Sequence, residues 1–327
     1  MPHLLHEFAS EADLVKAVGE LSAAFTTDRA NIQKYLSDPR LVSAYTAFYL
    51  TTNVPKLRAV MEWLTPEFRA EILKCELIDV GAGPGTFSMA WQELGGDAMV
   101  MLESSALMRQ QAARLLPEAK FKLGDLTRPR LMLFGHSLNE MGVEAGLKYV
   151  SEARPAHVWM IEPGTKEVFA LALEFRRRMI RDGWHVRYPC LGMGECPMNG
   201  SEDWCHQYVD VRHDPEVERL TQLAQRDRRH LPLTVMMFER EAIAKRDENL
   251  ARIVRTYPAT KFSHEWQVCR EEQGLVLERF QLPFKSYPKR EKKAVEALLA
   301  GALIQFETDK QMVDGRRIRL MREDNSE

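Results

Sequence analysis

The chain has 327 residues, of which 45% are hydrophobic and 28% are charged, and its formal net charge is −2. These proportions are typical of a folded globular protein, and the near-neutral balance excludes a general electrostatic attraction to nucleic acid. No apolar run reaches the about 18 residues that a membrane-spanning helix needs, and the N-terminus lacks the basic and apolar regions of a secretory signal, so we expect a cytoplasmic protein that binds no membrane.

Residues 1–75 are predicted to form an N-terminal helical region. Their apolar side chains recur at helical spacing, three or four positions apart. Ser10 and Asp38 are suitable residues for capping helix N-termini. Pro55 and Pro66 suit the first turns of helices, where a missing N–H costs nothing.

Residues 76–187 are predicted to form a Rossmann-like core, because short apolar runs there alternate with helical stretches. Predicted strands cover 77–80, 98–102, 121–123, 131–134 and 157–161, and predicted helices cover 87–94, 106–116 and 168–181. This alternation indicates an α/β fold with a parallel, doubly wound sheet.

Residues 188–290 are interpreted as a cysteine-rich, metal-binding segment followed by the closing strands of the sheet. Two apolar runs, 233–238 and 275–284, are predicted to be antiparallel strands at the end of that sheet. Residues 291–327 are predicted to be a basic C-terminal region, with an amphipathic helix over 291–303 and a frayed tail.

Basic residues gather near the C-terminus, where the segment from Lys285 to Arg322 holds ten basic and five acidic residues. This balance is compatible with RNA contact. Two further clusters, Arg176-Arg177-Arg178 and Arg226–His230, are either phosphate contacts or solvated helix faces.

A glycine-rich turn follows the first predicted strand directly and precedes a predicted helix; it reads Asp79-Val80-Gly81-Ala82-Gly83-Pro84-Gly85-Thr86. Glycines permit positive φ angles and a close approach to a ligand, and the new helix presents free N–H groups. Glu103 ends the second predicted strand, where a carboxylate can accept hydrogen bonds from both ribose hydroxyls. The dinucleotide fingerprint would need a glycine at position 86, where the chain has threonine.

The turn instead resembles motif I of the class I methyltransferases. That resemblance implies a seven-strand Rossmann-like sheet that binds S-adenosyl-L-methionine, with Asp79 orienting the turn and the methionine amino group. Gly124-Asp125 similarly resembles the adenine-side motif of that superfamily. The candidate cofactor-binding residues are Asp79, Gly81, Ala82, Gly83, Pro84, Gly85, Thr86, Glu103, Ser104 and Asp125.

The loop after the fourth predicted strand, His136-Ser137-Leu138-Asn139-Glu140, stands where methyltransferases usually carry their substrate-side motif. Methyl transfer needs alignment of the reactants and a base when the nucleophile carries a proton. His136, Asn139 and Glu140 are therefore weak catalytic candidates. The alternative is that they only close the cofactor pocket and cap a helix. The loop lacks both the Asn/Asp-Pro-Pro-Tyr signature of exocyclic-amine enzymes and a cysteine nucleophile.

Four of the five cysteines lie in the second half of the chain, at Cys190, Cys196, Cys205 and Cys269. Four thiolates can hold a tetrahedral zinc ion or a [4Fe–4S] cluster. Zinc sites usually contain Cys-x2-Cys pairs, and the wider spacings here favour the cluster. The alternatives are a zinc site, or unrelated thiols buried as small apolar groups. His206, beside Cys205, is an alternative ligand or a donor of a hydrogen bond to one.

Taken together, these segments resemble the methyltransferase-like proteins of mitochondrial small-ribosomal-subunit assembly and their bacterial relatives, over roughly residues 40–285. The motifs that carry the resemblance are the glycine turn, Ser137–Glu140, Ile161–Thr165 and Cys190…Cys196-Pro197…Asp203-Trp204-Cys205-His206.

The resemblance implies S-adenosylmethionine binding, a four-cysteine [4Fe–4S] cluster and association with the small ribosomal subunit or its rRNA. We expect no binding to DNA. Whether such a protein methylates RNA or chaperones its folding stays open. The alternatives are a small-molecule methyltransferase with a structural metal, and a non-catalytic RNA-binding assembly factor.

Overall fold

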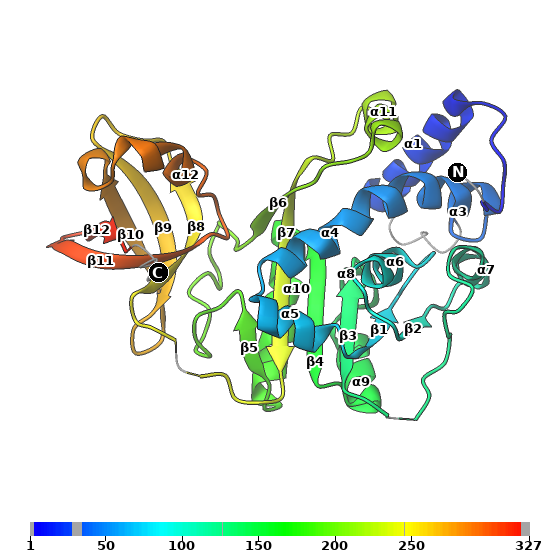
Figure 1. Cartoon of the computed structure of the whole chain (residues 1–327), viewed down its shortest axis with the longest axis horizontal. Coiled ribbons are helices and arrows are strands. Elements are labelled where there is room, and N and C mark those ends of the chain that lie inside the picture. The colour runs from blue at the N-terminus through cyan, green and yellow to red at the C-terminus, as the bar shows by residue number, and fades with distance from the viewer. Residues whose placement is uncertain (1–2, 28–34, 126, 245, 322–327) are drawn as a thin grey trace. The chain divides into compact units, whose positions relative to one another are not determined.

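A computed structural model describes residues 3–27, 35–125, 127–244 and 246–321 (Figure 1). The chain forms two compact units, one made of residues 1–141, 148–161 and 209–231, the other of residues 142–147, 162–208 and 232–327. Within the described ranges, no helix is long and apolar enough to span a bilayer.

The large sheet has the strand order β2-β1-β3-β4-β7-β5, and β6 also pairs with β7. β1 pairs in parallel with β2 and β3, β3 pairs in parallel with β4, and β5 runs antiparallel to β7. β1 and β3 are almost continuously buried, as expected where a parallel sheet is covered on both faces. The strands are β1 (Glu76–Val80), β2 (Met99–Leu102), β3 (Arg130–Gly135), β4 (His157–Pro163), β5 (His185–Tyr188), β6 (Gln207–Asp210) and β7 (His230–Glu239).

The predicted α/β Rossmann-like sheet, with helices before it, is confirmed. One predicted strand, 121–123, is wrong: Lys120 makes a single parallel bridge to Val100 and the chain then turns. The helices after β1 are α6 (Thr86–Glu93), α7 (Ala106–Leu115), α8 (Leu138–Met141), α9 (Val143–Ala153), α10 (Lys166–Arg181) and α11 (Pro215–Leu223).

The N-terminal region is helical, as predicted, and α4 packs against α6. Asp38 caps α3 by accepting a hydrogen bond from the Arg40 N–H at 2.8 Å, and Pro66 begins α5. The prediction that Pro55 starts a helix is wrong, because helical backbone runs without a break from Pro39 to Glu62 and contains a π-helical turn. The elements are α1 (Glu11–Thr27), α3 (Pro39–Tyr45), the π-helical turn η2 (Thr46–Leu50), α4 (Thr51–Glu62) and α5 (Pro66–Ile72).

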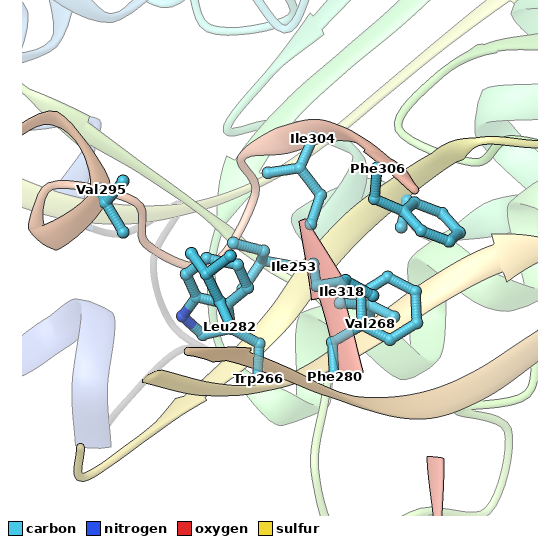
Figure 2. Packing of buried hydrophobic residues seen from close by; sticks show 10 residues of the cluster. Ile253, Trp266, Val268, Phe280, Leu282, Val295, Ile304, Phe306 and Ile318 are labelled. Carbon is cyan, nitrogen blue, oxygen red and sulfur yellow. The ribbon is translucent and has the colours of Figure 1, made fainter. Parts of the chain in front are cut away.

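A closed five-stranded barrel lies in the second unit, with the strand order β10-β12-β11-β8-β9. Neighbouring strands are antiparallel except β10 and β12, which are parallel. Figure 2 shows aromatic and branched side chains from these strands, including Trp266, Phe280 and Phe306, gathered in its interior. The elements are β8 (Leu250–Tyr257), β9 (Ser263–Glu271), β10 (Leu275–Pro283), α12 (Lys292–Glu296), β11 (Leu303–Met312) and β12 (Gly315–Leu320).

The barrel corrects two predictions. The run 275–284 does not end the large sheet but forms β10 of the barrel. The helix predicted over 291–303 is confined to α12, which ends at Glu296, and the chain then turns at the left-handed Gly301 (φ +97°) before β11. Of the predicted tail, only Met321 lies within the described residues.

Candidate functional site

The glycine turn between β1 and α6 has the backbone that a close ligand approach requires. Gly81, Gly83 and Gly85 have φ angles of +68°, +56° and +93°. A Cβ at Gly81 would lie 2.6 Å from the Cβ of Ser137, which no side chain tolerates. The backbone at these positions is therefore available only to glycine.

Glu103 holds this turn from the end of β2. Its Oε2 accepts a hydrogen bond from the Gly83 N–H at 2.8 Å, and its Oε1 accepts one from the Ser105 N–H at 2.7 Å. A carboxylate has about four acceptor positions, so the group is fixed in place while it keeps the capacity to accept further hydrogen bonds. This is the capacity that a ribose diol would use.

Asp79 is buried beneath the turn and ties β1 to α6. Its Oδ2 accepts hydrogen bonds from the Ser88 N–H at 3.0 Å and the Ser88 hydroxyl at 2.8 Å. Burial raises the pKa of Asp79 to about 7, against the opposing effect of the Ser88 hydrogen bonds. The carboxyl group is therefore partly protonated at neutral pH, and its observed contacts are with the protein framework.

The predicted loop after β3 lies against the same turn. His136 is held at φ +58°, an uncommon angle for a non-glycine residue, and its ring stacks on Phe87 with the centroids 6.0 Å apart. Lys56 Nζ lies 2.8 Å from His136 Nε2. Because an ammonium group can only donate, Nε2 accepts and the imidazole is neutral. Burial, then the Lys56 charge, lowers the pKa of His136 well below its usual range.

Two buried polar atoms around the turn have no hydrogen-bond partner within the described residues. They are Oγ1 of Thr86, the first residue of α6, and Oδ1 of Asn139, which lies on α8. Glu140, the next residue, is exposed. A buried polar atom without a partner is unfavourable unless a ligand or water satisfies it.

Asp125 stands apart from these residues. It is exposed, and Arg130 Nη2 donates to its backbone carbonyl at 3.2 Å and to that of Gly124 at 2.6 Å. In the described part of the chain, no hydrogen bond or ion pair joins Asp125 to the glycine turn. Ser104 contributes its carbonyl to Arg109 Nη1 at 2.7 Å.

The N-terminal helices bring three residues to the site that the sequence did not identify. Tyr45 Cε1 would lie 4.0 Å from a Cβ at Gly83, Lys56 contacts His136, and Asn53 Oδ1 accepts from Arg228 Nη2 at 2.8 Å. Burial lowers the pKa of Arg228. Lys56 could have been identified from the sequence, because it lies within the apolar stretch Val54–Leu57. A buried cation is costly, so such a lysine often belongs to a functional site.

The four predicted cysteine ligands line one cavity in the second unit. Apolar side chains from α10 and β8 complete its wall, together with the guanidinium of Arg252. The cavity residues are Phe169, Leu173, Pro189, Cys190, Leu191, Cys196, Met198, Cys205, Met236, Arg252, Val254, Cys269 and Leu275. Cys190 and Cys269, which are 79 positions apart in the sequence, thus line the same small cavity. Cys75 lies elsewhere and is buried.

These thiols are close enough to influence one another. Burial, then the neighbouring Cys190, raises the pKa of Cys196 to about 11. Burial, followed by the nearby Cys190 and Cys196, raises the pKa of Cys205 to about 12. Burial, followed by the three other thiols, also raises the pKa of Cys269. Across the described ranges, no set of three or more His, Cys, Asp or Glu side chains stands in a geometry that holds a metal ion.

Three arginines fix the loop that carries the first three cysteines. Arg176 donates to the carbonyls of Gly192 and Gly194 at 3.1 and 2.9 Å. Arg252 donates to the Pro189 carbonyl at 2.6 Å, and Arg246 donates to the Cys190 carbonyl. Arg176 is therefore neither a phosphate contact nor a solvated residue. Each guanidinium satisfies loop carbonyls that would otherwise lack partners.

The model of the family "Mitochondrial small ribosomal subunit Rsm22" matches residues 40–279 of the chain. No curated protein matches the chain.

Several solved structures are similar in part. Magnesium protoporphyrin IX methyltransferase from Synechocystis with bound S-adenosylmethionine shares 12% identity, covering 72% of this chain and 100% of its own, with a TM-score of 0.36. An S-adenosylmethionine-dependent methyltransferase from Mesorhizobium loti shares 16% identity, covering 56% of this chain and 100% of its own, with a TM-score of 0.32.

Proposed function

The chain belongs to the family of the mitochondrial small ribosomal subunit protein Rsm22, and we propose that it is an S-adenosylmethionine-binding, methyltransferase-like factor that acts on small-subunit rRNA or chaperones its folding. One observation carries the cofactor assignment. The buried oxygens Thr86 Oγ1, directly after the glycine turn, and Asn139 Oδ1, after β3, lack partners in the described chain. A ligand rich in hydrogen-bond donors suits this arrangement.

Each residue then has a role that its contacts support. Glu103, held by the Gly83 N–H, would accept the ribose hydroxyls, and Asn139 Oδ1 would accept from the methionine ammonium group. When bound, the cofactor supplies an electrophilic methyl group. His136 is a poor base because Lys56 occupies its Nε2, and we assign it to closing the pocket. This leaves the exposed carboxylate of Glu140 as the candidate base.

We further propose that Cys190, Cys196, Cys205 and Cys269 hold a [4Fe–4S] cluster. Four thiols lining one largely apolar cavity support it, since deprotonated thiolates there need a positive partner beyond Arg252. Bound iron would supply that charge and tie the loop to β9. The arginines that fix the loop carbonyls would hold Cys190 and its neighbours in position.

The cofactor proposal is tested by titrating purified protein with S-adenosylmethionine in a calorimeter. Glu103→Ala should weaken binding by about tenfold or more, since it removes an acceptor of charge-assisted hydrogen bonds. Glu93→Ala, an exposed carboxylate at the end of α6, is the matched control and should bind as the wild type does. Wild-type protein without affinity for the cofactor would end this assignment.

The cluster proposal is tested by iron and sulfide analysis after anaerobic purification. Cys205→Ser should lose iron, and Cys75→Ser, which changes a thiol outside the cavity, should keep it. Stoichiometric zinc without iron would replace the cluster with a zinc site. The RNA assignment is tested by crosslinking in cells, where recovery of no small-subunit rRNA would contradict it.

A further inference from the structure

The barrel has an outer surface suited to a ligand. Its interior is filled by side chains such as Trp266, Phe280 and Ile318 (Figure 2), so nothing can bind inside. In chain order, its first three strands pair successively, α12 follows the third, and the fifth strand runs parallel to the third. This is the connectivity of the OB-fold, a barrel that binds oligonucleotides on the outer face of its second and third strands.

Strand register places polar and basic residues in two rows on that outer face. Tyr257, Glu265, Gln281 and Arg317 are successive partners across β8, β9, β10 and β12. Two positions along, Arg255, Gln267 and Arg279 are partners across β8, β9 and β10. Partners in register project to the same side of a sheet, so the rows form one surface.

The contacts within this surface are organised around Tyr257. The guanidinium groups of Arg255 and Arg279 lie 5.4 and 4.9 Å from the centre of its ring, and its hydroxyl donates to Gln267 Oε1 at 3.2 Å. Glu265, which is buried, pairs with Arg279 and accepts from Gln281 Nε2 at 3.3 Å. Glu265 therefore positions a cation and an amide that are presented outward.

The β11–β12 hairpin turns this surface into a groove. The groove has a volume of about 360 Å³ and lies between the side chains of β9 and β10 and hairpin residues 312–316. Val313, at the hairpin tip, is fully exposed, and Phe262, in the β8–β9 loop, is 78% exposed. Val313 lines the groove, and Phe262 immediately precedes β9, the strand that contributes Glu265 to the groove.

The charge of the barrel indicates an anionic ligand. Residues 250–321 contain 14 Lys and Arg against nine Asp and Glu, a net charge of +5 in a chain whose total is −2. Within the described ranges, Arg317 and Lys261 make no ion pair. The groove is lined by Arg279 and Arg316 together with Glu265 and Asp314, and Arg255 and Arg317 lie in the strand rows beside it. Cations beside a groove, with the exposed ring of Phe262 just before β9, suit a phosphate backbone whose bases are unpaired and can stack.

We propose that this groove, between β9–β10 and the β11–β12 hairpin, binds a short single-stranded segment of RNA. Arg279 and Arg317 contact phosphates, and Phe262 offers a face on which a base stacks. A neutral oligosaccharide would leave the arginine rows unexplained, and a duplex would hide the base faces that the aromatic residues require. The choice of RNA over DNA rests on the proposed function.

The test is fluorescence anisotropy with the full chain and a labelled, mixed-sequence single-stranded RNA of about 12 nucleotides, a length within the site size of such barrels. Arg279→Ala/Arg317→Ala should weaken binding by about tenfold or more and lower the salt dependence by about 0.7 per lost phosphate contact. Phe262→Ala should weaken binding by about fivefold or more. The matched control is Arg181→Ala/Arg219→Ala, which removes two exposed arginines, one on α10 and one on α11, and should stay within about twofold of the wild type.

The outcomes separate this inference from the proposed function. Groove variants that bind the oligonucleotide like the wild type would overturn the groove, while rRNA crosslinking by the wild type would leave the proposed function in place. Wild-type protein that crosslinks to rRNA but does not bind the oligonucleotide would likewise overturn the groove and leave the proposed function in place. Equal affinity for single-stranded DNA of the same sequence would overturn the RNA assignment, and a wild type that binds no RNA would overturn both.

Discussion

Asp79 makes the stability of the first unit depend on pH in a direction opposite to that of most carboxylates. Its side chain is buried, and burial raises its pKa from 3.8 to about 7. The folded state therefore binds this proton more tightly than the unfolded chain does. Its contribution to stability is fully present below the unfolded value near 3.8 and is lost as the pH rises towards the folded value.

The size of the effect follows from the shift. A rise of about three pKa units, at about 1.4 kcal/mol each, means that ionising Asp79 in the folded state costs about 4 kcal/mol. Between about pH 5 and 6.5 the folded state holds the proton and the unfolded chain does not, so the free energy of unfolding falls by about 2 kcal/mol over that interval. Asp79→Asn removes the titration but keeps an oxygen that can accept from both Ser88 donors.

Urea unfolding of the wild type and Asp79→Asn, followed by tryptophan fluorescence across this pH range, measures the effect. The difference between the two proteins isolates Asp79, because His136 has a lowered pKa and destabilises both of them alike as the pH falls below its unfolded value. The variant should gain about 2 kcal/mol relative to the wild type between about pH 5 and 6.5. Asp97→Asn, at an exposed aspartate of the same unit, should run parallel to the wild type. If the free energy of unfolding of Asp79→Asn changes with pH as that of the wild type does, the Asp79 carboxyl group is not protonated in the folded protein.

Three further predictions test the packing of both sites. Gly81→Ala should destabilise the protein by about 3 kcal/mol or more and abolish cofactor binding, because the new Cβ would lie 2.6 Å from a neighbouring carbon. The control is Gly95→Ala, where φ is also positive but no atom lies within 4 Å of the new Cβ, and it should cost only about 1 kcal/mol of stability. Thermal melting measures the stability and calorimetry measures the cofactor binding. Arg252→Ala should lower the midpoint of urea unfolding and the iron content together, because it leaves buried carbonyls unpaired; unchanged iron content would count against its role in the loop. Trp204→Phe should cost about 1 kcal/mol in chemical denaturation through loss of the 2.9 Å hydrogen bond to the Gly164 carbonyl, and no loss would mean that water replaces it.

The parallel part of the fold could be read from the sequence because its signals are local. Runs such as Leu131–Phe134 are buried on both faces and therefore apolar throughout. The glycine turn likewise carries its own backbone requirement at positions 81, 83 and 85. Each of these segments indicates its conformation without reference to a distant partner.

The strand pairing of the barrel and the contacts of the basic residues at both sites could not be predicted in the same way. The run 275–284 was correctly predicted as a strand, but nothing in it specifies whether its partner is β9 or the large sheet. Lys56 meets His136 across 80 positions of sequence, and Arg252 meets the Pro189 carbonyl across 63. Such pairings are set by the fold as a whole, so no local pattern predicts them.

Strand β9 links the cysteine cavity to the proposed RNA groove. Cys269 and Gln267 are two positions apart on this strand and project to the same outer face, the first into the cavity and the second into the arginine rows. Arg255, the partner of Gln267, also pairs with Asp203 of the cysteine loop at 2.6 Å. A metal that ties Cys269 to the loop would therefore fix the strand that presents the groove, and loss of the metal should weaken RNA binding without removing any phosphate contact.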